Sequence, residues 1–401
     1  MRVERLSVAR SPDTPEHVRL IADIRHRDGT VEEYWFEVAE EFEPVLSTTG
    51  NPWLVCLLPL AMASGEPLEL RVPVDRLLLE PAGYLMQIWK LWYPDLTVVP
   101  LEAPVYDGSV RTEGKAAAFF SGGVDSFYTA LRHRPGVAET AVHLDDLLFV
   151  RGADIFIDKR DVFHHVREDL DDAASELGMR LVVVATNLRD TRWGERTNWG
   201  MLSHGAALAA AALVLEARYR LVMIASSITY RVMIPWGSHP LTDPLYSTAG
   251  LRVVYDGGFM SRSGKVRALT EADVAMRHLR VCYRSEAGDN CCRCEKCYRT
   301  TAMLAAFDAL HRCTTLRSEE FRLERLARLY LPSRTINGIR ELESLARQLD
   351  KPALARALRR CLRRSRFLHS TLPVVRRFRG TPIVAAVAGR LEGRLLAGAF
   401  R

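Results

Sequence analysis

The feature that most constrains this chain is a short loop of small and polar residues between an apolar run and a helical run. Residues 115–120 predict a buried strand, and residues 126–133 predict a helix. The loop between them reads Ser121-Gly122-Gly123-Val124-Asp125-Ser126. Glycines have no Cβ, so backbone N–H groups can approach a phosphate, and a helix N-terminus adds partial positive charge at the same place. This order of strand, turn and helix predicts an anion-binding site.

The polar side chains of this loop suit a nucleotide phosphate. Ser121 and Ser126 have hydroxyl groups that can donate to phosphate oxygens, and Asp125 can hold Mg2+. The pattern G-x-x-x-x-G-K-[ST] is missing at this position, which excludes the Walker type of phosphate loop. The alternative interpretation is an ordinary Gly-Gly turn in front of a helix.

A cluster of cysteines predicts a metal site. Cys282, Cys291, Cys294 and Cys297 follow the spacing C-x8-C-x2-C-x2-C, which is typical of four thiolates around Zn2+. Disulfides are the alternative, but residues 1–7 contain no apolar signal-like stretch, and clustered cysteines in a cytoplasmic chain favour a metal. Cys292 is a fifth thiol that could replace Cys291 as a ligand.

The two motifs together resemble the N-type PP-loop ATP pyrophosphatases, and within them the 7-cyano-7-deazaguanine synthase family. The resemblance covers residues 113–312 and implies an adenine nucleotide alpha hydrolase-like fold in which the loop 121–126 holds the pyrophosphate of ATP. In that family, ATP adenylates a carboxylate, and ammonia then displaces AMP. A second ATP-dependent round gives a nitrile, and the zinc is structural.

Two segments differ from the substrate-reading segments of that family. Residues 198–205 lack the family's proline and arginine. The stretch 235–248 is long, polar and bracketed by prolines, and we interpret it as a substrate loop over ATP. These differences concern recognition of the substrate and leave the ATP chemistry unchanged. The additional regions before residue 113 and after residue 312 favour a specialised relative that acts on a larger acceptor, such as a peptide or protein terminus.

The chain is predicted to have three parts. Residues 1–112 form a small α+β domain, and residues 113–312 form an α/β domain with a doubly wound parallel sheet that includes the zinc segment 282–297. Residues 313–401 form a basic helical region. Apolar strands alternate with helices in the middle part, as a buried parallel sheet requires. The elements expected include strands at 17–26, 31–38, 181–185 and 221–224, and helices at 77–92, 162–177, 202–216 and from Pro352 onward.

The sheet adds two residues to the predicted nucleotide site. Ligands of such sheets bind beyond the carboxyl ends of the strands, so the loops after residues 120, 185 and 224 should meet at one edge. Asn187 and Ser226 lie in the second and third of these loops.

Lys265 and His239 are the other catalytic candidates, beside Asp125 and Ser126. Lys265 is expected just ahead of a helix that begins at residue 270, where it would stabilise charge at the α-phosphate. His239 lies in the predicted substrate loop and would act as a general base. A solvated turn lysine and a structural histidine are the alternatives.

Charge is distributed unevenly along a chain of ordinary composition. Residues 316–401 contain 20 Lys and Arg against 7 Asp and Glu, whereas the whole chain has a net charge of +6. This basic region predicts RNA, an acidic partner or a membrane surface as ligand, with a solvated face as the alternative. Since no run of 18 apolar residues occurs, we expect no transmembrane segment. We expect a cytoplasmic protein, and a homodimer is left open.

These observations predict an AMP-forming enzyme that uses ATP to activate a carboxylate or amide oxygen of a small molecule or peptide. Ammonia or an amine then displaces AMP. One alternative is a PP-loop enzyme that thiolates or amidates tRNA, in which the cysteines hold an iron-sulfur group. Another is a non-catalytic subunit in which ATP only sets a conformation.

Overall fold

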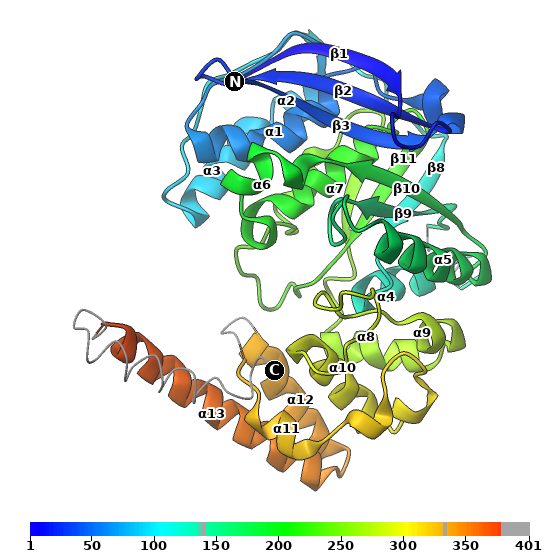
Figure 1. Ribbon diagram of the computed structural model, residues 1–401, viewed down its shortest axis with the longest axis vertical. Coiled ribbons are helices and arrows are strands. Elements are labelled where there is room, and N and C mark those ends of the chain that lie inside the picture. Colours follow the sequence, from blue (N-terminus) through cyan, green and yellow to red (C-terminus); the bar gives the residue numbers. More distant parts are fainter. Residues whose placement is uncertain (135, 138–141, 332–334, 378–401) are drawn as a thin grey trace. The chain divides into compact units, whose positions relative to one another are not determined.

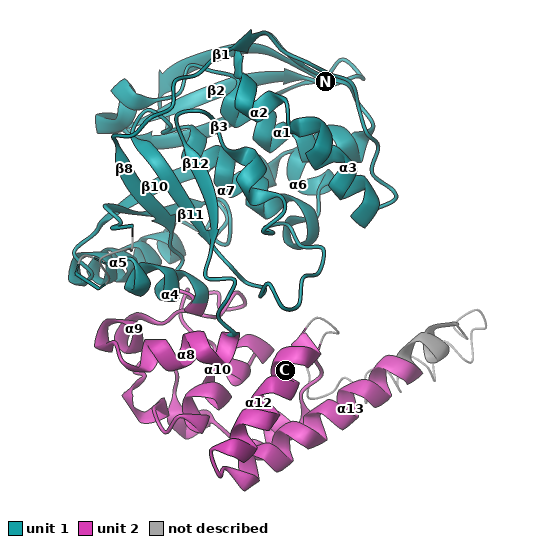
Figure 2. Ribbon diagram, turned by 180° about the vertical axis from the view of Figure 1, so that it is seen from behind, with its two compact units in different colours: residues 1–121, 125–261 teal, residues 122–124, 262–401 magenta. Residues whose placement is uncertain are grey.

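The computed structural model describes residues 1–134, 136–137, 142–331 and 335–377 (Figure 1). The chain forms two compact units (Figure 2). Unit 1 contains residues 1–121 and 125–261, and unit 2 contains residues 122–124 and the chain from 262 onward. Residues 378–401 of the predicted basic region lie outside the described residues.

Unit 1 is built on a ten-stranded, mostly parallel sheet (Figure 1). From one edge to the other, the strands are β12 (Arg252–Asp256), β11 (Tyr219–Ala225), β8 (Lys115–Phe119), β9 (Asp146–Arg151), β10 (Arg180–Thr186), β3 (Val31–Ala39), β2 (His17–Arg25), β1 (Arg2–Arg10), β4 (Leu68–Leu70) and β6 (Leu101–Glu102). The expected α/β class with a parallel sheet is confirmed for β8 to β12, whose mutual pairs are all parallel.

The N-terminal strands extend this sheet. β3 pairs antiparallel with β10, with Glu37 opposite Ala185 and Phe36 opposite Thr186. Strands β1 to β3 then form an antiparallel meander. The predicted boundary at residue 112 therefore lies inside unit 1, where strands from both sides of it share one sheet and one apolar core.

Helices cover the sheet of unit 1. They are α1 (Asn51–Ser64), α2 (Arg76–Leu79), α3 (Ala82–Trp92), α4 (Val124–Arg132), α5 (Arg160–Glu176), α6 (Arg192–Arg196) and α7 (His204–Leu213). The alanine-rich α7 packs against α1, and both helices are buried around nearly their whole circumference. The single helix predicted at 77–92 is wrong, because the chain breaks near Pro81 into α2 and α3.

Unit 2 is helical. It contains α8 (Arg262–Thr270), α9 (Asp273–His278), α10 (Glu295–Ala306), α11 (Leu323–Arg328), α12 (Ile336–Gln348) and α13 (Pro352–Arg377). The predicted helix start at Pro352 is confirmed. The expectation that a helix begins at residue 270 is wrong, because α8 ends there and α9 begins three residues later. Among the described residues, no helix is both long and apolar enough to cross a membrane.

Candidate functional site

The loop 121–126 has the predicted strand, turn and helix around it. β8 ends at Phe119 and α4 begins at Val124. Gly122 has a φ of 72°, a left-handed conformation that strongly favours glycine. The backbone N–H of Ser121 donates to Oγ of Ser126 at 3.3 Å, and this hydrogen bond joins the first and last residues of the loop. Within unit 2, the N–H of Arg280 donates to the carbonyl of Gly122 at 2.8 Å.

The sheet topology places the start of this loop at a point where strand order reverses. From β8 the chain continues to β9 and then β10 on one side, whereas β11 and β12 lie on the other side. Crossovers from neighbouring strands therefore leave in opposite directions beyond the carboxyl ends of β8 and β11. This is the usual ligand position in open α/β sheets.

A buried carboxylate that sequence reasoning missed anchors α4. Asp256 is the last residue of β12, and its oxygens accept from Thr129 Oγ1 at 2.8 Å, Arg132 at 2.6 Å and His133 at 3.1 Å. Burial opposes ionisation, but these hydrogen bonds and the Arg132 charge hold the pKa of Asp256 below its usual value. Asp256 therefore fixes the helix whose N-terminus follows the loop. Its only sequence signal was an aspartate between an apolar run and two glycines.

Ser226 lies at the end of β11, next to Asp256 and Gly257 at the end of β12. It follows β11 directly, is fully buried, and its backbone N–H donates to the carbonyl of Asp256 at 2.8 Å. A Cβ placed on Gly257 would lie 3.3 Å from the ring of Tyr128 and 3.5 Å from Ser226 Oγ. The end of β12 thus has Ser226 on one side and α4 on the other.

The side-chain amide of Asn187 is hydrogen-bonded to the backbone of β3. Its Oδ1 accepts from the N–H of Trp35 at 2.9 Å, and its Nδ2 donates to the carbonyl of Glu33 at 2.8 Å. The side chain continues the pairing of β10 with β3 beyond the last ladder bond. A nucleotide-binding role for Asn187 stays a prediction.

His239 and Asp243 form a buried turn in the predicted substrate loop. His239 Nδ1 accepts from the N–H of Leu241 at 3.1 Å, and the ring packs edge-on against Trp92 at 4.7 Å between centroids. The carboxylate of Asp243 accepts from Ser238 Oγ at 2.6 Å and from the N–H of His239 at 2.9 Å. Burial raises the pKa of Asp243 to about 7, and it lowers the pKa of His239. The base role of His239 stays a prediction.

Lys265 belongs to unit 2. It lies inside α8 rather than ahead of a helix, and only 3% of it is exposed. A solvated turn lysine is thereby excluded. Its role at the α-phosphate stays a prediction.

The four predicted cysteines meet in unit 2. Their sulfur atoms all lie within 4.8 Å of one another. The Sγ–Sγ distance is 3.9 Å for Cys282–Cys294 and for Cys291–Cys297, and 3.5 Å for Cys294–Cys297. Four sulfurs at about 2.3 Å from a tetrahedral Zn2+ lie about 3.8 Å apart. The cluster therefore fits a metal ion such as zinc, and all four cysteines are free of disulfides.

Local hydrogen bonds shape this cysteine cluster. Asn290 is buried, and its Oδ1 accepts from the backbone N–H groups of Val281 and Cys282. The N–H of Cys294 donates to Sγ of Cys291 at 3.3 Å. The neighbouring thiols donate to Cys282 and hold its pKa well below the usual range.

Cys292 is not part of the cluster. Its backbone has a φ of 53°, which turns it away from its neighbours in sequence, and its Sγ accepts from the N–H of Arg317 at 3.4 Å. The structure thus selects Cys291 rather than Cys292 as the fourth candidate ligand.

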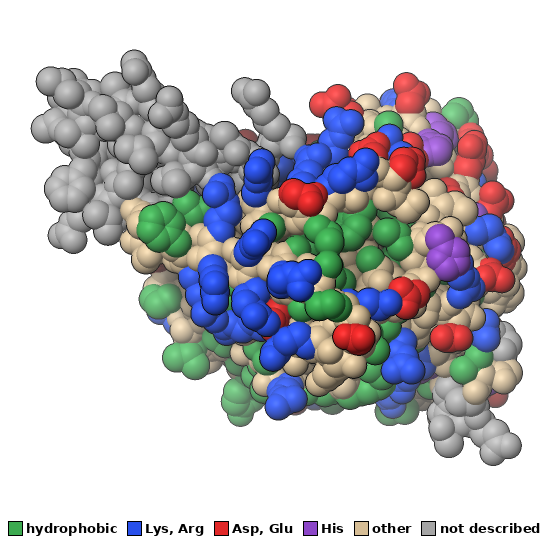
Figure 3. Space-filling model, turned by 90° about the horizontal axis from the view of Figure 1, so that it is seen from below, with side chains coloured by type: hydrophobic (Ala, Val, Ile, Leu, Met, Phe, Trp, Pro, Cys, Tyr) green, Lys and Arg blue, Asp and Glu red, His purple; other side chains and the backbone are tan. Residues whose placement is uncertain are grey.

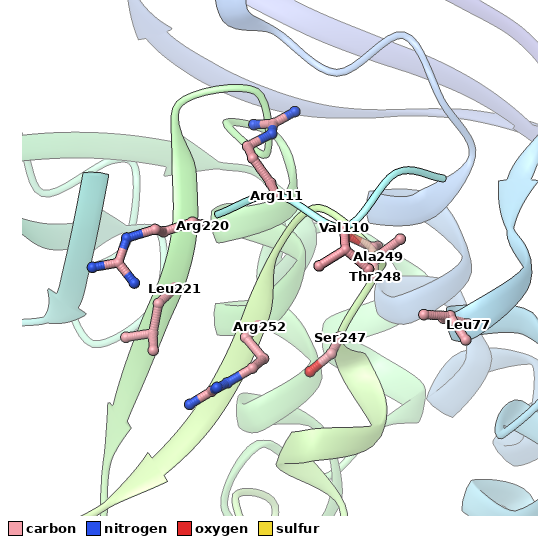
Figure 4. Close-up of a pocket in the computed structure, with 9 residues that line it drawn as sticks. All are labelled: Leu77, Val110, Arg111, Arg220, Leu221, Ser247, Thr248, Ala249 and Arg252. Atoms are coloured by element: carbon pink, nitrogen blue, oxygen red, sulfur yellow. The ribbon is translucent and has the colours of Figure 1, made fainter. Parts of the chain in front are cut away.

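A cavity of about 470 Å³ lies near the amino ends of β11 and β12 (Figure 4). Arg220, the second residue of β11, and Arg252, the first residue of β12, line it, and so does Arg111 from the segment that precedes β8. Arg111 is already bound, since it donates to the carbonyls of Glu216 and Ala217. Because the loop 121–126 follows the other end of β8, this cavity is separate from the candidate nucleotide site.

Comparison with protein-family models, with curated proteins and with solved structures finds no match to this chain.

Proposed function

We propose that the chain is an ATP-dependent, AMP-forming enzyme of the PP-loop class. The observation that supports this most is the Ser121–Ser126 loop at the point where strand order reverses, between a parallel strand and the N-terminus of α4. An Asp and two Ser side chains at such a turn suit a magnesium-bound pyrophosphate better than an uncharged ligand.

The proposed reaction has two steps. A carboxylate or amide oxygen attacks the α-phosphorus of ATP, the bond to the β-phosphate oxygen breaks, and pyrophosphate leaves with the bonding electrons. Ammonia or an amine then attacks the activated carbon, AMP leaves, and the nitrogen loses a proton. The loop N–H groups and the hydroxyls of Ser121 and Ser126 would hold the pyrophosphate, and Asp125 would hold Mg2+. Asp256 positions α4 for this task.

The cysteine cluster has a separate, structural role in this proposal. Cys282, Cys291, Cys294 and Cys297 would hold Zn2+, whose chemistry there is to crosslink a segment that has no helix or strand between Leu279 and Cys294. No step of the reaction needs this metal. Iron with labile sulfide in the purified protein would instead favour tRNA thiolation.

The test measures AMP from the purified full-length chain. Mg-ATP, 7-carboxy-7-deazaguanine and ammonia are supplied, and AMP and new amide or nitrile products are followed by mass spectrometry. Asp125→Asn should lower AMP formation about 100-fold or more. Asp95→Asn, which changes an exposed aspartate outside the loop, should leave it unchanged. AMP that forms only with cell extract or tRNA would move the search to another acceptor, and ADP with phosphate would refute the proposal.

A further inference from the structure

The exposed face of α13 presents a stripe of arginines. Arg356, Arg360 and Arg363 follow one another at intervals of four and three residues, so that each lies about one helical turn beyond the last. Arg359 and Arg366 flank them on the same side, and all five are exposed. No Asp or Glu occurs anywhere between Pro352 and Arg377.

The arginine stripe is poorly neutralised by its surroundings. Arg359 donates to Oε1 of Glu343 in α12 at 2.9 Å. Arg356, Arg360, Arg363 and Arg366 have no ion pair with any residue that the structure describes. Four guanidinium groups within about three helical turns therefore repel one another, and an anion that bridges them would remove this repulsion.

Buried residues on the opposite face of α13 keep the arginine stripe turned towards solvent. Leu358, Cys361 and Leu368 are fully buried, and α13 packs against α11 and α12. Rotation of the helix would expose these apolar side chains, so the arginines are held towards solvent. Lys and Arg side chains gather on this face of the molecule (Figure 3).

We propose that the arginine stripe of α13 binds the phosphate backbone of a nucleic-acid strand. The planar guanidinium matches phosphate geometry with two parallel hydrogen bonds, which a lysine cannot offer. Phe367 is 59% exposed beside Arg363 and Arg366, and an exposed ring among arginines is a platform on which a base can stack. This binding is independent of the proposed adenylating function.

A membrane surface fits this face less well. Interfacial helices pair their basic face with a row of large apolar side chains that enter the lipid. From Pro352 to Thr371, Phe367 is the one exposed large apolar side chain, because the other large apolar residues of this stretch face the unit's interior. The charge pattern of α13 thus matches a polyanion that stays in water.

The test is fluorescence anisotropy of the full-length protein with labelled 30-nucleotide single-stranded RNA, single-stranded DNA and duplex DNA, over a series of salt concentrations. The triple variant R356A/R360A/R363A should bind at least tenfold more weakly at 0.1 M salt. Its slope of log K against log salt should be shallower by about 2, since each lost phosphate contact removes about 0.7 for a single strand. Comparison of the three probes decides whether RNA or DNA is preferred.

A matched triple variant controls for total charge. R27A/R134A/R252A removes three exposed arginines of unit 1 that have no ion pair with a described residue, and it should bind within about twofold of the wild type. Thermal unfolding confirms that both variants fold, and R356K/R360K/R363K should retain the salt slope because it retains the charge. Equal losses in the two alanine variants would overturn the proposal. So would binding to vesicles with 30% phosphatidylserine but to none of the nucleic acids.

Discussion

Unit 1 buries apolar side chains along its whole sheet, from Val3 in β1 to Val253 in β12, and its two most buried helices are almost free of polar residues. Unit 2 is helical, but its segment from Leu279 to Cys294 has no helix or strand. Three cysteines of that segment, Cys282, Cys291 and Cys294, converge with Cys297 of α10. The comparison teaches that apolar burial orders unit 1, whereas part of unit 2 has, in place of helices and strands, a four-cysteine cluster that could hold a metal ion.

The largest effect should follow from loss of a cluster cysteine. Structural zinc contributes about 10 kcal/mol or more of binding free energy, which is also folding free energy. Cys294→Ser should abolish zinc binding, measured by elemental analysis, and should unfold unit 2 in hydrogen exchange while the strands of unit 1 stay protected. Cys292→Ser is the matched control and should keep one zinc per chain, because Cys292 lies outside the cluster. If Cys292→Ser lost zinc and Cys294→Ser kept it, Cys292 rather than Cys294 would be the zinc ligand.

A core substitution in unit 1 should show the opposite pattern. Trp193 is fully buried, and its Nε1 donates to the carbonyl of Cys56 at 2.6 Å. Trp193→Ala should lower the free energy of unfolding by about 3–5 kcal/mol in urea titrations, with zinc content unchanged. Leu91→Ala, at a side chain that is 81% exposed, should change it by less than about 0.5 kcal/mol. If Trp193→Ala released zinc, the apolar core of unit 1 and the cysteine cluster of unit 2 would not be independent.

The buried Asp243 predicts that the stability of unit 1 depends on pH. Burial raises the pKa of Asp243 from its ordinary value of 3.8 to about 7. Between these two values, the folded chain keeps a proton that the unfolded chain has released, so the stability from this group is full at lower pH and is lost as pH rises to about 7. Urea titrations at pH 5 and pH 7.5 should show that Asp243→Asn weakens this loss. Asp95→Asn should keep the wild-type difference, and an equal effect of both would contradict the assignment.

The smallest effect concerns the loop that follows β8. Gly122→Ala should lower the free energy of unfolding by about 1–2 kcal/mol, because an alanine at a φ of 72° is strained. Gly83→Ala, in α3 and with no atom within 4 Å of the added Cβ, should instead raise stability by about 0.5–1 kcal/mol. Chemical denaturation of both variants measures whether the free energy of unfolding falls or rises. If both substitutions changed the free energy of unfolding in the same direction, a side chain at residue 122 would not strain the backbone.

Local patterns predicted the parts of the fold that are set locally. The apolar run at 181–185 lies in β10, the run at 221–224 lies in β11, and Pro352 begins α13. Local patterns could not predict long-range strand pairing, because no local feature of Phe36 or Glu37 indicates that β3 pairs with β10. For the same reason Asp256 was missed, because its partners Thr129 and His133 lie more than 120 residues away.

The candidate sites show the same limit. The cysteines converge as predicted because their spacing is local, within 16 residues. Ser226 and Tyr128 of α4 both lie beside Gly257, because adjacent parallel strands end on the same side of the sheet, a rule that sequence order alone can apply. Asn187 obeys the same rule, but its amide bonds to β3, a neighbour that the predicted domain boundary had placed elsewhere.

The most direct test of the account is exchange of radiolabelled pyrophosphate into ATP. The full-length protein is incubated with Mg-ATP, labelled pyrophosphate and 7-carboxy-7-deazaguanine, and in parallel with a cell-extract fraction as the source of acceptor, without ammonia. Reversible adenylation predicts label in ATP that depends on the acceptor and is lost in Asp125→Asn. Turnover of ATP to ADP and phosphate, with no label in ATP under either condition, would contradict it.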